Sequence, residues 1–297
     1  MRASANGIEL EYDSVGDPAA PAVLLVMGLG TQMTRWPPAL VGALVAAGYR
    51  VIRFDNRDVG LSTRLDDAGT PDMAAVFAAL MSGGAPAVAY GLSDMAADAV
   101  GLLDALGIER AHLVGASMGG MIAQLVAASH PDRTRSLTSI MSSTGNPALP
   151  RASDAVLALM ASPRPDPTDE AAVIERAVRG GALTGSPGYP VDDAVRAAAA
   201  LADYRRAYYP AGTLRQTAAI AAGGDRRPLL RTIAAPTLVI HGTDDPLVRV
   251  EAGRDTAAAI PGAELIEIAG MGHDVPEALV PRIAEAIVRL ARRADRP

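Results

Sequence analysis

The sequence predicts an α/β protein with a mostly parallel sheet of eight strands, helices on both faces of the sheet and an inserted helical cap. Short apolar runs recur along the chain, helix-like segments separate most of them, and this alternation stops between residues 143 and 232. Continuous apolar runs are typical of strands that are buried on both faces. Strands that alternate with helices form a parallel sheet because each helix returns the chain to the same edge.

The N-terminal region is expected to be β-structure. Asn6-Gly7 predicts a hairpin turn between Ala3 and Ile8, and the alternating IELEYDSV follows this turn. The first continuous apolar run is AVLLVM at 22–27. Later runs of the same character are YRVIRF (49–54), AHLVG (111–115), LTSIM (137–141), TLVIHG (237–242) and ELIEI (264–268).

Helix-like segments fill most of the intervals between these runs. They cover residues 36–47, 93–106, 117–129, 251–259 and 276–293. In the second of them, Ser93 is expected to cap the N-terminus and Gly107 to end the helix. Residues 143–232 instead carry alanine-rich, helix-like pieces and no convincing buried strand. We therefore expect a helical cap at 143–232 and a core formed by residues 1–142 and 233–297.

Composition excludes several kinds of partner. The 297 residues are 49% hydrophobic and 20% charged, which is typical of a globular protein with a large core. The net charge of −6 comes from 27 basic and 33 acidic residues without a basic block, so we expect neither nucleic acid nor a membrane surface as a partner. A small molecule is the expected partner, and a monomer or homodimer is the expected assembly.

The chain contains no cysteine, so neither disulfides nor thiolate metal sites contribute. No apolar run reaches the roughly 18 residues of a membrane-spanning helix, and the N-terminus lacks the apolar stretch of a signal peptide. These features predict a cytoplasmic protein. The motif spacing shows no cluster of metal ligands, and the expected chemistry needs neither a metal nor an organic cofactor.

The stretch HLVGASMGGMIAQ (112–124) holds the candidate nucleophile. Ser117 lies where a buried strand passes directly into a helix, and ligands bind at such strand ends in parallel sheets. A turn this sharp requires small residues two before and two after the serine, and these are Gly115 and Gly119. The turn exposes the hydroxyl and directs the N–H of Met118 toward the space beside it.

A serine nucleophile needs a base, and histidine suits this role near neutral pH. The chain has four histidines. His112 opens a buried strand and is expected to be structural, His130 lies at a helix end, and His241 ends a strand as a supporting residue. His273 lies in GMGH, a loop of small residues after the last strand, from which an imidazole can reach over the end of the sheet. His273 is therefore the candidate base.

The third member of a triad must orient the imidazole and stabilise its charge. HGTDDP (241–246) follows a predicted strand and offers two adjacent carboxylates, Asp244 and Asp245. Neighbouring side chains at a strand end point in different directions, so one of the two meets His273 and the other caps the turn or faces solvent. The order serine, aspartate, histidine goes with the strand–serine–helix turn and differs from the orders of two protease families.

With these motifs on one chain, the sequence resembles the α/β-hydrolase fold superfamily along nearly its whole length. In that family the acid is commonly the third residue after the glycine of an H-G-x-x-D pattern, which selects Asp245. The family usually carries H-G-x after its third strand, and the last amide completes the oxyanion hole. This chain has MGLG (27–30) there, so the resemblance implies that the N–H of Leu29 acts beside that of Met118, although Met27 replaces the histidine.

The stretch FDNRDVGLS (54–62) resembles the family's F-D-x-R-G-x-G-x-S loop, with Asp58 at a common glycine position. The resemblance implies that Asp55 and Arg57 hold this loop and take no part in the reaction. Haloalkane dehalogenases and epoxide hydrolases of this fold use an aspartate as nucleophile, so Ser117 argues against both activities. In some family members the acid lies at the end of strand six. The corresponding stretch here, SIMSSTGNP (139–147), carries no carboxylate and therefore cannot supply the acid.

We therefore expect a serine hydrolase that cleaves a small-molecule carboxylic ester. MGLGTQMTRWP, FDNRDVGLS, GASMGG and GMGH together also resemble a subgroup that includes anthracycline methylesterases. A lactonase, a carbon–carbon bond hydrolase or a cofactor-free perhydrolase can use the same triad, and a ligand receptor can keep the same fold. Methionines are frequent near the predicted site, and the expected substrate-binding residues are Gly28, Met33, Met141 and Met271.

Overall fold

The computed structural model describes residues 1–296 and contains an eight-stranded sheet in the order β1-β2-β4-β3-β5-β6-β7-β8. The strands are β1 (Arg2–Ala5), β2 (Ile8–Val15), β3 (Ala22–Val26), β4 (Arg50–Phe54), β5 (Ala111–Ala116), β6 (Thr134–Ile140), β7 (Thr237–Gly242) and β8 (Glu264–Ile268). β2 pairs antiparallel with β1 and with β4, whereas the pairings from β4 to β8 are parallel. The prediction of a mostly parallel sheet of eight strands is confirmed.

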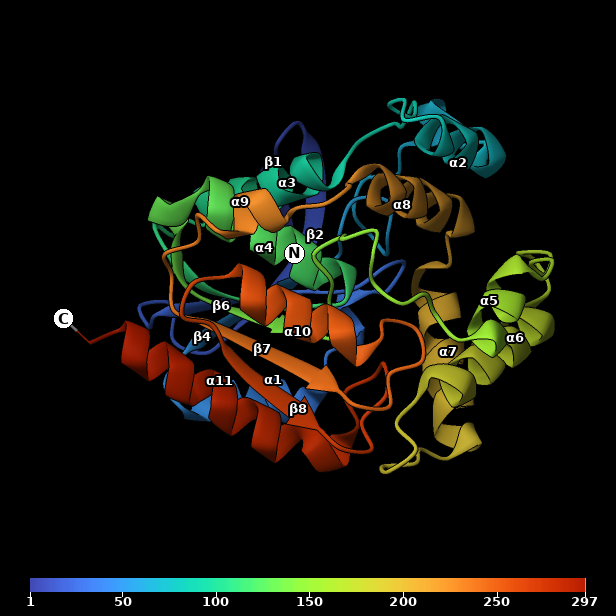
Figure 1. Cartoon of the computed structure of the whole chain (residues 1–297). Coiled ribbons are helices and arrows are strands. Elements are labelled where there is room, and N and C mark those ends of the chain that lie inside the picture. The colour runs from blue at the N-terminus through green and yellow to red at the C-terminus, as the bar shows by residue number, and fades with distance from the viewer. Residues whose placement is uncertain (297) are drawn as a thin grey trace.

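Helices cover both faces of this sheet (Figure 1). They are α1 (Pro38–Ala46), α2 (Met73–Met81), α3 (Leu92–Ala105), α4 (Met118–Ser129), α5 (Asp154–Ala161), α6 (Glu170–Thr184), α7 (Asp193–Ala207), α8 (Pro210–Ala222), α9 (Arg227–Leu230), α10 (Val250–Ala259) and α11 (Val280–Ala294). Short 3-10 helices lie at Met33–Arg35, Asp66–Ala68, Pro131–Arg133 and Glu277–Leu279. α1 and α11 pack together on one face, and α3 and α4 pack together on the other.

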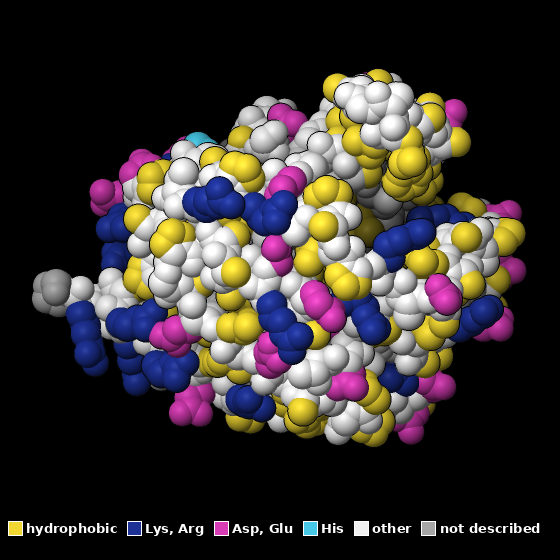
Figure 2. Space-filling view, viewed as in Figure 1, with side chains coloured by type: hydrophobic (Ala, Val, Ile, Leu, Met, Phe, Trp, Pro, Cys, Tyr) yellow, Lys and Arg dark blue, Asp and Glu magenta, His cyan; other side chains and the backbone are white. Residues whose placement is uncertain are grey.

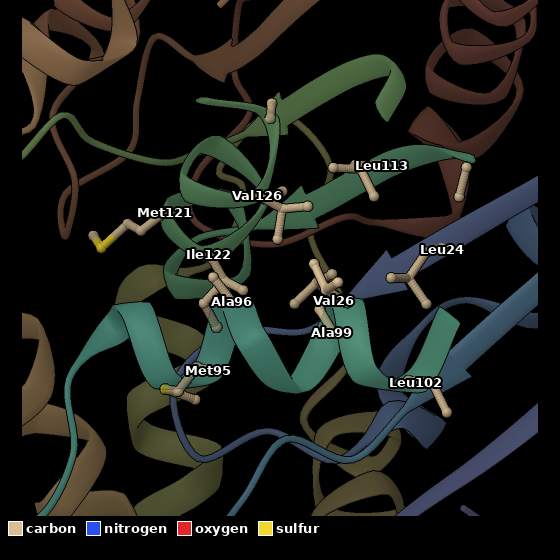
Figure 3. Packing of buried hydrophobic residues seen from close by; sticks show 14 of the residues in the cluster. Leu24, Val26, Met95, Ala96, Ala99, Leu102, Leu113, Met121, Ile122 and Val126 are labelled. Atoms are coloured by element: carbon tan, nitrogen blue, oxygen red, sulfur yellow. The ribbon is translucent and has the colours of Figure 1, made fainter. Parts of the chain in front are cut away.

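Two buried apolar clusters hold these layers together, one on each face of the sheet. Along β3, Leu24 and Val26 belong to the cluster under α3 and α4, whereas Val23 and Leu25 belong to the cluster under α1 and α11. Figure 3 shows part of the first cluster, in which Leu24 and Val26 of β3 lie among side chains of the two helices, namely Ala99 and Leu102 of α3 and Ile122 and Val126 of α4. The central strands are buried on both faces, which is why their sequences are continuous apolar runs.

Several predicted helix boundaries needed correction. The helix predicted at 36–47 begins at Pro38, because two successive prolines follow Trp36 and keep its backbone extended. The prediction that Ser93 caps α3 is wrong: the N-cap is Gly91, whose N–H donates to the Asp94 carboxylate at 2.8 Å. The helix predicted at 276–293 starts with a 3-10 turn and becomes α-helical only from residue 280.

Helix α2 was not predicted. Its sequence, MAAVFAALM, is apolar on every side, so it lacks the polar and apolar faces by which a surface helix is recognised. The side chain of Asp72 caps it by accepting the N–H groups of Ala74 and Ala75. Phe77 and Met81 are exposed, and Figure 2 shows apolar side chains gathered on the projection at the upper right, where α2 lies.

The segment between β6 and β7, residues 143–232, is helical and contains α5 to α9. We call it the inserted segment. α5, α6 and α7 lie beyond the carboxyl ends of the strands, and α8 lies beside α2 (Figure 1). The inserted segment therefore covers the edge of the sheet at which the loops after β3, β4, β5, β7 and β8 meet. Its action as a separate cap unit remains a prediction.

Candidate active site

Ser117 lies in a sharp turn between β5 and α4. Its backbone is strained, with φ of 55° and ψ of −120°, and its N–H donates to the carbonyl of Ile140 at 2.9 Å. A Cβ on Gly115 would lie 2.1 Å from the carbonyl oxygen of Gly119, and a Cβ on Gly119 would lie 2.0 Å from that of Val26. Both positions require glycine because strand, turn and helix approach too closely for a side chain.

The hydroxyl of Ser117 and the carboxylate of Asp245 flank the imidazole of His273. Nε2 of His273 lies 2.9 Å from Oγ of Ser117, and Nδ1 lies 2.6 Å from Oδ2 of Asp245. The backbone N–H of His273 donates to the carbonyl of Thr184 at 2.7 Å, so the end of α6 holds the loop that carries the imidazole. The structure thus brings together the three residues that the sequence marks as nucleophile, base and acid.

Asp245 is almost completely buried and accepts several hydrogen bonds. Its Oδ1 accepts the N–H of Leu247 at 2.9 Å and that of Val248 at 2.8 Å. Burial by itself raises the pKa of Asp245, but the imidazoles of His241 and His273 and the N–H of Val248 outweigh burial and lower this pKa to about 2. The carboxylate is therefore ionised near neutral pH and can stabilise a positive charge on His273.

The adjacent Asp244 has different partners. Its Oδ2 accepts the hydroxyl of Thr243 at 2.7 Å and the N–H of Gly270 at 2.8 Å. These hydrogen bonds lower the pKa of Asp244 and hold the turn after β7 against the loop after β8. Asp245 therefore contacts His273, and Asp244 stabilises the turn.

The loop after β3 passes close to Ser117. A Cβ on Gly28 would lie 3.2 Å from Cβ of Ser117 and 3.7 Å from its Oγ. Within residues 1–296, no acceptor pairs with the backbone N–H of Leu29 or with that of Met118. Two donors, one in the loop after β3 and one at the first residue of α4, are therefore free to bind a ligand atom at this end of the sheet.

Buried charges hold the loop after β4. The carboxylate of Asp55 accepts the N–H of Met33 at 2.8 Å and thus ties the loop after β4 to the loop after β3. Arg57 forms an ion pair with Asp98 of α3 at 2.6 Å. Both side chains have protein partners that account for their burial, as the expected structural roles require.

The inserted segment contributes two buried side chains that sequence reasoning missed. Arg215 of α8 pairs with Asp58 at 2.8 Å. Gln216 accepts the N–H of Gly30 at 2.8 Å and donates to the carbonyl of Arg57 at 2.8 Å. The one signal in the sequence was Asp58 itself, because a carboxylate at a common glycine position needs a partner when it is buried.

A cavity of about 190 Å³ lies between the loops after β3 and β4 and helices α6, α7 and α8. Its lining includes Gly30, Val59, Val173, Ala200, Tyr204 and Thr213. None of the four predicted substrate-binding residues lines this cavity; these residues are Gly28, Met33, Met141 and Met271. Met141 and Met271 pack into the core cluster under α1 and α11, and Met33 is buried. Contact of these four residues with a substrate remains a prediction.

The remaining histidines have structural environments. Nδ1 of His112 lies 2.9 Å from the Ser136 hydroxyl, and burial lowers the pKa of His112. His130 follows α4 and donates its backbone N–H to the last turn of that helix. Nε2 of His241 lies 2.7 Å from the carbonyl of Val248 and 3.6 Å from Oδ2 of Asp245, so His241 supports the turn that presents Asp245.

Residues 1–296 contain no group of three or more His, Asp or Glu side chains placed to hold a metal ion. Over the same residues, no helix is both long enough and apolar enough to cross a membrane.

A serine, a histidine and an aspartate joined by hydrogen bonds at the carboxyl ends of parallel strands define a hydrolase of the alpha/beta fold. The family model for the alpha/beta hydrolase fold matches residues 21–277, and the chain belongs to this family. The predicted resemblance to the superfamily is confirmed.

Three relatives illustrate the range of this family. A rhodomycin D methylesterase, DnrP, from Streptomyces peucetius is 32% identical over 97% of this chain and 96% of the relative. A 2-hydroxy-6-oxononadienedioate/2-hydroxy-6-oxononatrienedioate hydrolase from Paraburkholderia xenovorans is 30% identical over 90% of this chain and 84% of the relative. The crystal structure of the enol-lactonase from Burkholderia xenovorans superimposes with a TM-score of 0.74, at 26% identity, over 98% of this chain and 100% of that protein.

Proposed function

We propose that the protein hydrolyses carboxylic esters through a covalent acyl-enzyme. The observation that carries this proposal is the hydrogen-bonded chain from Ser117 through His273 to Asp245, with heavy-atom distances of 2.9 and 2.6 Å. An imidazole between a hydroxyl and an ionised carboxylate is arranged to remove the hydroxyl proton as the oxygen attacks a carbonyl. The similarity to a methylesterase supports an ester as the substrate.

In acylation, Oγ of Ser117 attacks the ester carbonyl carbon while Nε2 of His273 takes the hydroxyl proton. Asp245 accepts the N–H at Nδ1 and stabilises the imidazolium that forms. The carbonyl oxygen becomes an oxyanion and accepts hydrogen bonds from the N–H groups of Leu29 and Met118. The carbon–oxygen bond to the alcohol then breaks, His273 protonates the departing oxygen, and the acyl group remains on Ser117.

In deacylation, a water molecule takes the place of the alcohol. His273 removes a proton from this water as its oxygen attacks the acyl carbon, and the same two N–H groups bind the second oxyanion. The bond to Oγ of Ser117 breaks, the proton on His273 returns to Oγ, and the carboxylic acid is released.

The inserted segment forms the cap of the substrate site in this proposal. A cavity of about 190 Å³ lies under this segment, between α6, α7, α8 and the loop after β3, and it reaches Gly30 next to Leu29 but is not lined by Ser117 or His273. Pockets for whole drug-sized ligands measure about 300–1,000 Å³, so this cavity suits one part of an ester. Val59, Val173 and Ala200 offer apolar contacts there and Tyr204 offers an aromatic surface, whereas Gln32, Asp58 and Asp203 add polar groups to the lining.

Lactone hydrolysis and carbon–carbon bond hydrolysis are the second candidates, because an enol-lactonase and a dienedioate hydrolase are also similar to this chain. Both reactions use a serine triad on a different carbonyl substrate, and substrate choice depends on the cap. A ligand receptor on this fold is distinguished from all of these enzymes by turnover, since a receptor hydrolyses its ligand slowly or once.

The test is steady-state hydrolysis of p-nitrophenyl esters from acetate to decanoate. The Ser117→Ala variant is expected to lose at least about a thousandfold in kcat/KM relative to wild type. Ser129→Ala is the matched control, because Ser129 is exposed at the opposite end of the same helix. Equal rates for wild type and Ser117→Ala would contradict the proposal, and lactones and carbon–carbon substrates would then be tested next.

A further inference from the structure

The loop that carries Leu29 is held from the inserted segment. Gln216 of α8 is completely buried, and its side chain bridges two loops of the core. Its Oε1 accepts the N–H of Gly30 at 2.8 Å, and its Nε2 donates to the carbonyl of Arg57 at 2.8 Å. A Cβ on Gly30 would lie 2.6 Å from the hydroxyl of Thr213, so α8 rests directly on this loop.

These contacts fix a peptide plane next to the free N–H of Leu29. The hydroxyl of Thr31 donates to the carbonyl of Leu29 at 3.0 Å, and Gln216 binds the N–H of Gly30 on the other side of the same peptide. The preceding peptide is held in part, because the N–H of Thr31 donates to the carbonyl of Gly28 at 3.2 Å. Gly30 has φ of +61°, and glycine adopts other φ values easily, so the loop does not hold this geometry by its own conformational preference.

We propose that Gln216 is a positioning residue, which holds the N–H of Leu29 in the direction needed to bind the oxyanion. This inference rests on the function proposed above. Without the Gln216 side chain, the N–H of Gly30 loses its protein acceptor. Rotation of the Leu29–Gly30 peptide toward another acceptor then shifts the adjoining Gly28–Leu29 peptide, which carries the N–H of Leu29, and turns this N–H away from the substrate. In the native protein, the inserted segment would therefore affect the chemical step through Gln216, in addition to its effect on substrate choice.

The experiment compares affinity for the transition state with affinity for the substrate. The probe is a trifluoromethyl ketone with the acyl chain of the best p-nitrophenyl ester, because its adduct with Ser117 carries an oxyanion. In Gln216→Met, which keeps the side-chain length but has no polar group, the Ki of the ketone is expected to rise about 10- to 100-fold and kcat to fall by a similar factor. KM is expected to change less than about twofold, since the ester carbonyl binds the N–H groups weakly before attack.

Two further variants complete the comparison. Gln216→Asn is one methylene too short to reach Gly30 and Arg57 together. The ratio of its Ki for the ketone to its KM for the ester is therefore expected to rise, as in Gln216→Met. This ratio is independent of the folded fraction, so Gln216→Asn decides the matter if Gln216→Met does not fold. Arg215→Lys is the matched control, because it weakens the neighbouring contact of α8 with Asp58 and leaves Gly30 untouched.

The outcomes separate the two proposals. If the wild type neither turns over esters nor binds the ketone, the esterase proposal fails. If the wild type is active and the Gln216 variants keep its ratio of Ki to KM, the positioning role is wrong. The same conclusion follows if Ki and KM rise together, or if Arg215→Lys gives the same selective loss, because Gln216 would then act only through pocket shape or through the position of α8.

Discussion

Asp58 and Arg215 form a bidentate ion pair between the core and the inserted segment. Nη2 and Nε of Arg215 each lie 2.8 Å from one carboxylate oxygen of Asp58, and both side chains are almost completely buried. The Tyr90 hydroxyl donates to the same carboxylate at 2.8 Å. Burial raises the pKa of Asp58, but these partners outweigh burial and hold the pKa below its usual value. The loop after β4 and helix α8 are thereby joined.

We predict that Arg215→Met lowers the free energy of unfolding by about 3–5 kcal/mol, because it leaves the Asp58 carboxylate buried without its cation. Urea unfolding followed by circular dichroism measures this change. In the double variant Asp58→Asn/Arg215→Met, part of the stability is expected to return because no unpaired charge remains. If Arg215→Met unfolds at the same urea concentration as wild type, the pair does not join the two parts.

We predict that the two adjacent aspartates differ sharply in catalysis. Asp245→Asn is expected to lower kcat by about 10⁴-fold, because the amide neither stabilises the imidazolium nor selects the required tautomer of His273. Asp244→Asn is expected to leave kcat close to wild type, since Asp244 binds Thr243 and Gly270. Steady-state kinetics with the best p-nitrophenyl ester measures both variants. Similar losses of kcat in the two variants would contradict this prediction, because they would show that catalysis depends on the turn after β7 and not on the contact of Asp245 with His273.

The lowered pKa of Asp245 predicts a specific dependence of stability on pH. The pKa is about 2 in the folded protein and 3.8 in the reference state, so the unfolded chain binds the proton more readily. Asp245 therefore contributes about 2 kcal/mol of stability above pH 4, and this contribution is lost as the pH falls from about 4 to 2. Unfolding free energies of wild type and Asp245→Asn at pH 6, 4 and 3 measure the effect. Parallel curves for the two proteins would contradict it.

The same substitution at two glycines is predicted to have opposite effects. Gly119→Ala is expected to destabilise the protein by about 3 kcal/mol or more, because its Cβ would lie 2.0 Å from the backbone oxygen of Val26. Gly42→Ala is expected to stabilise it by about 0.5–1 kcal/mol, since Gly42 lies within α1 and nothing lies within 4 Å of a Cβ there. Thermal and urea unfolding of both variants measure these changes. Equal destabilisation by both would contradict the close contact at Gly119.

The sequence by itself determined the features that depend on local patterns. Continuous apolar runs marked the central strands, because a strand buried on both faces has no polar side. The spacing of Gly115, Ser117 and Gly119 marked the turn, because that conformation has strict local requirements for small residues. Helix α2 escaped prediction because its sequence is apolar on every side and contains no periodic contrast.

The tertiary structure decided which distant groups meet. Sequence periodicity left Asp244 and Asp245 equivalent, and the resemblance to a family favoured Asp245; the hydrogen bond to His273 distinguishes them in the folded chain. Gln216 lies 186 residues from Gly30 in sequence, and no local pattern marks that pair. Such pairings depend on how whole helices and loops pack, because a buried polar group accepts whichever partner the packed chain brings within reach.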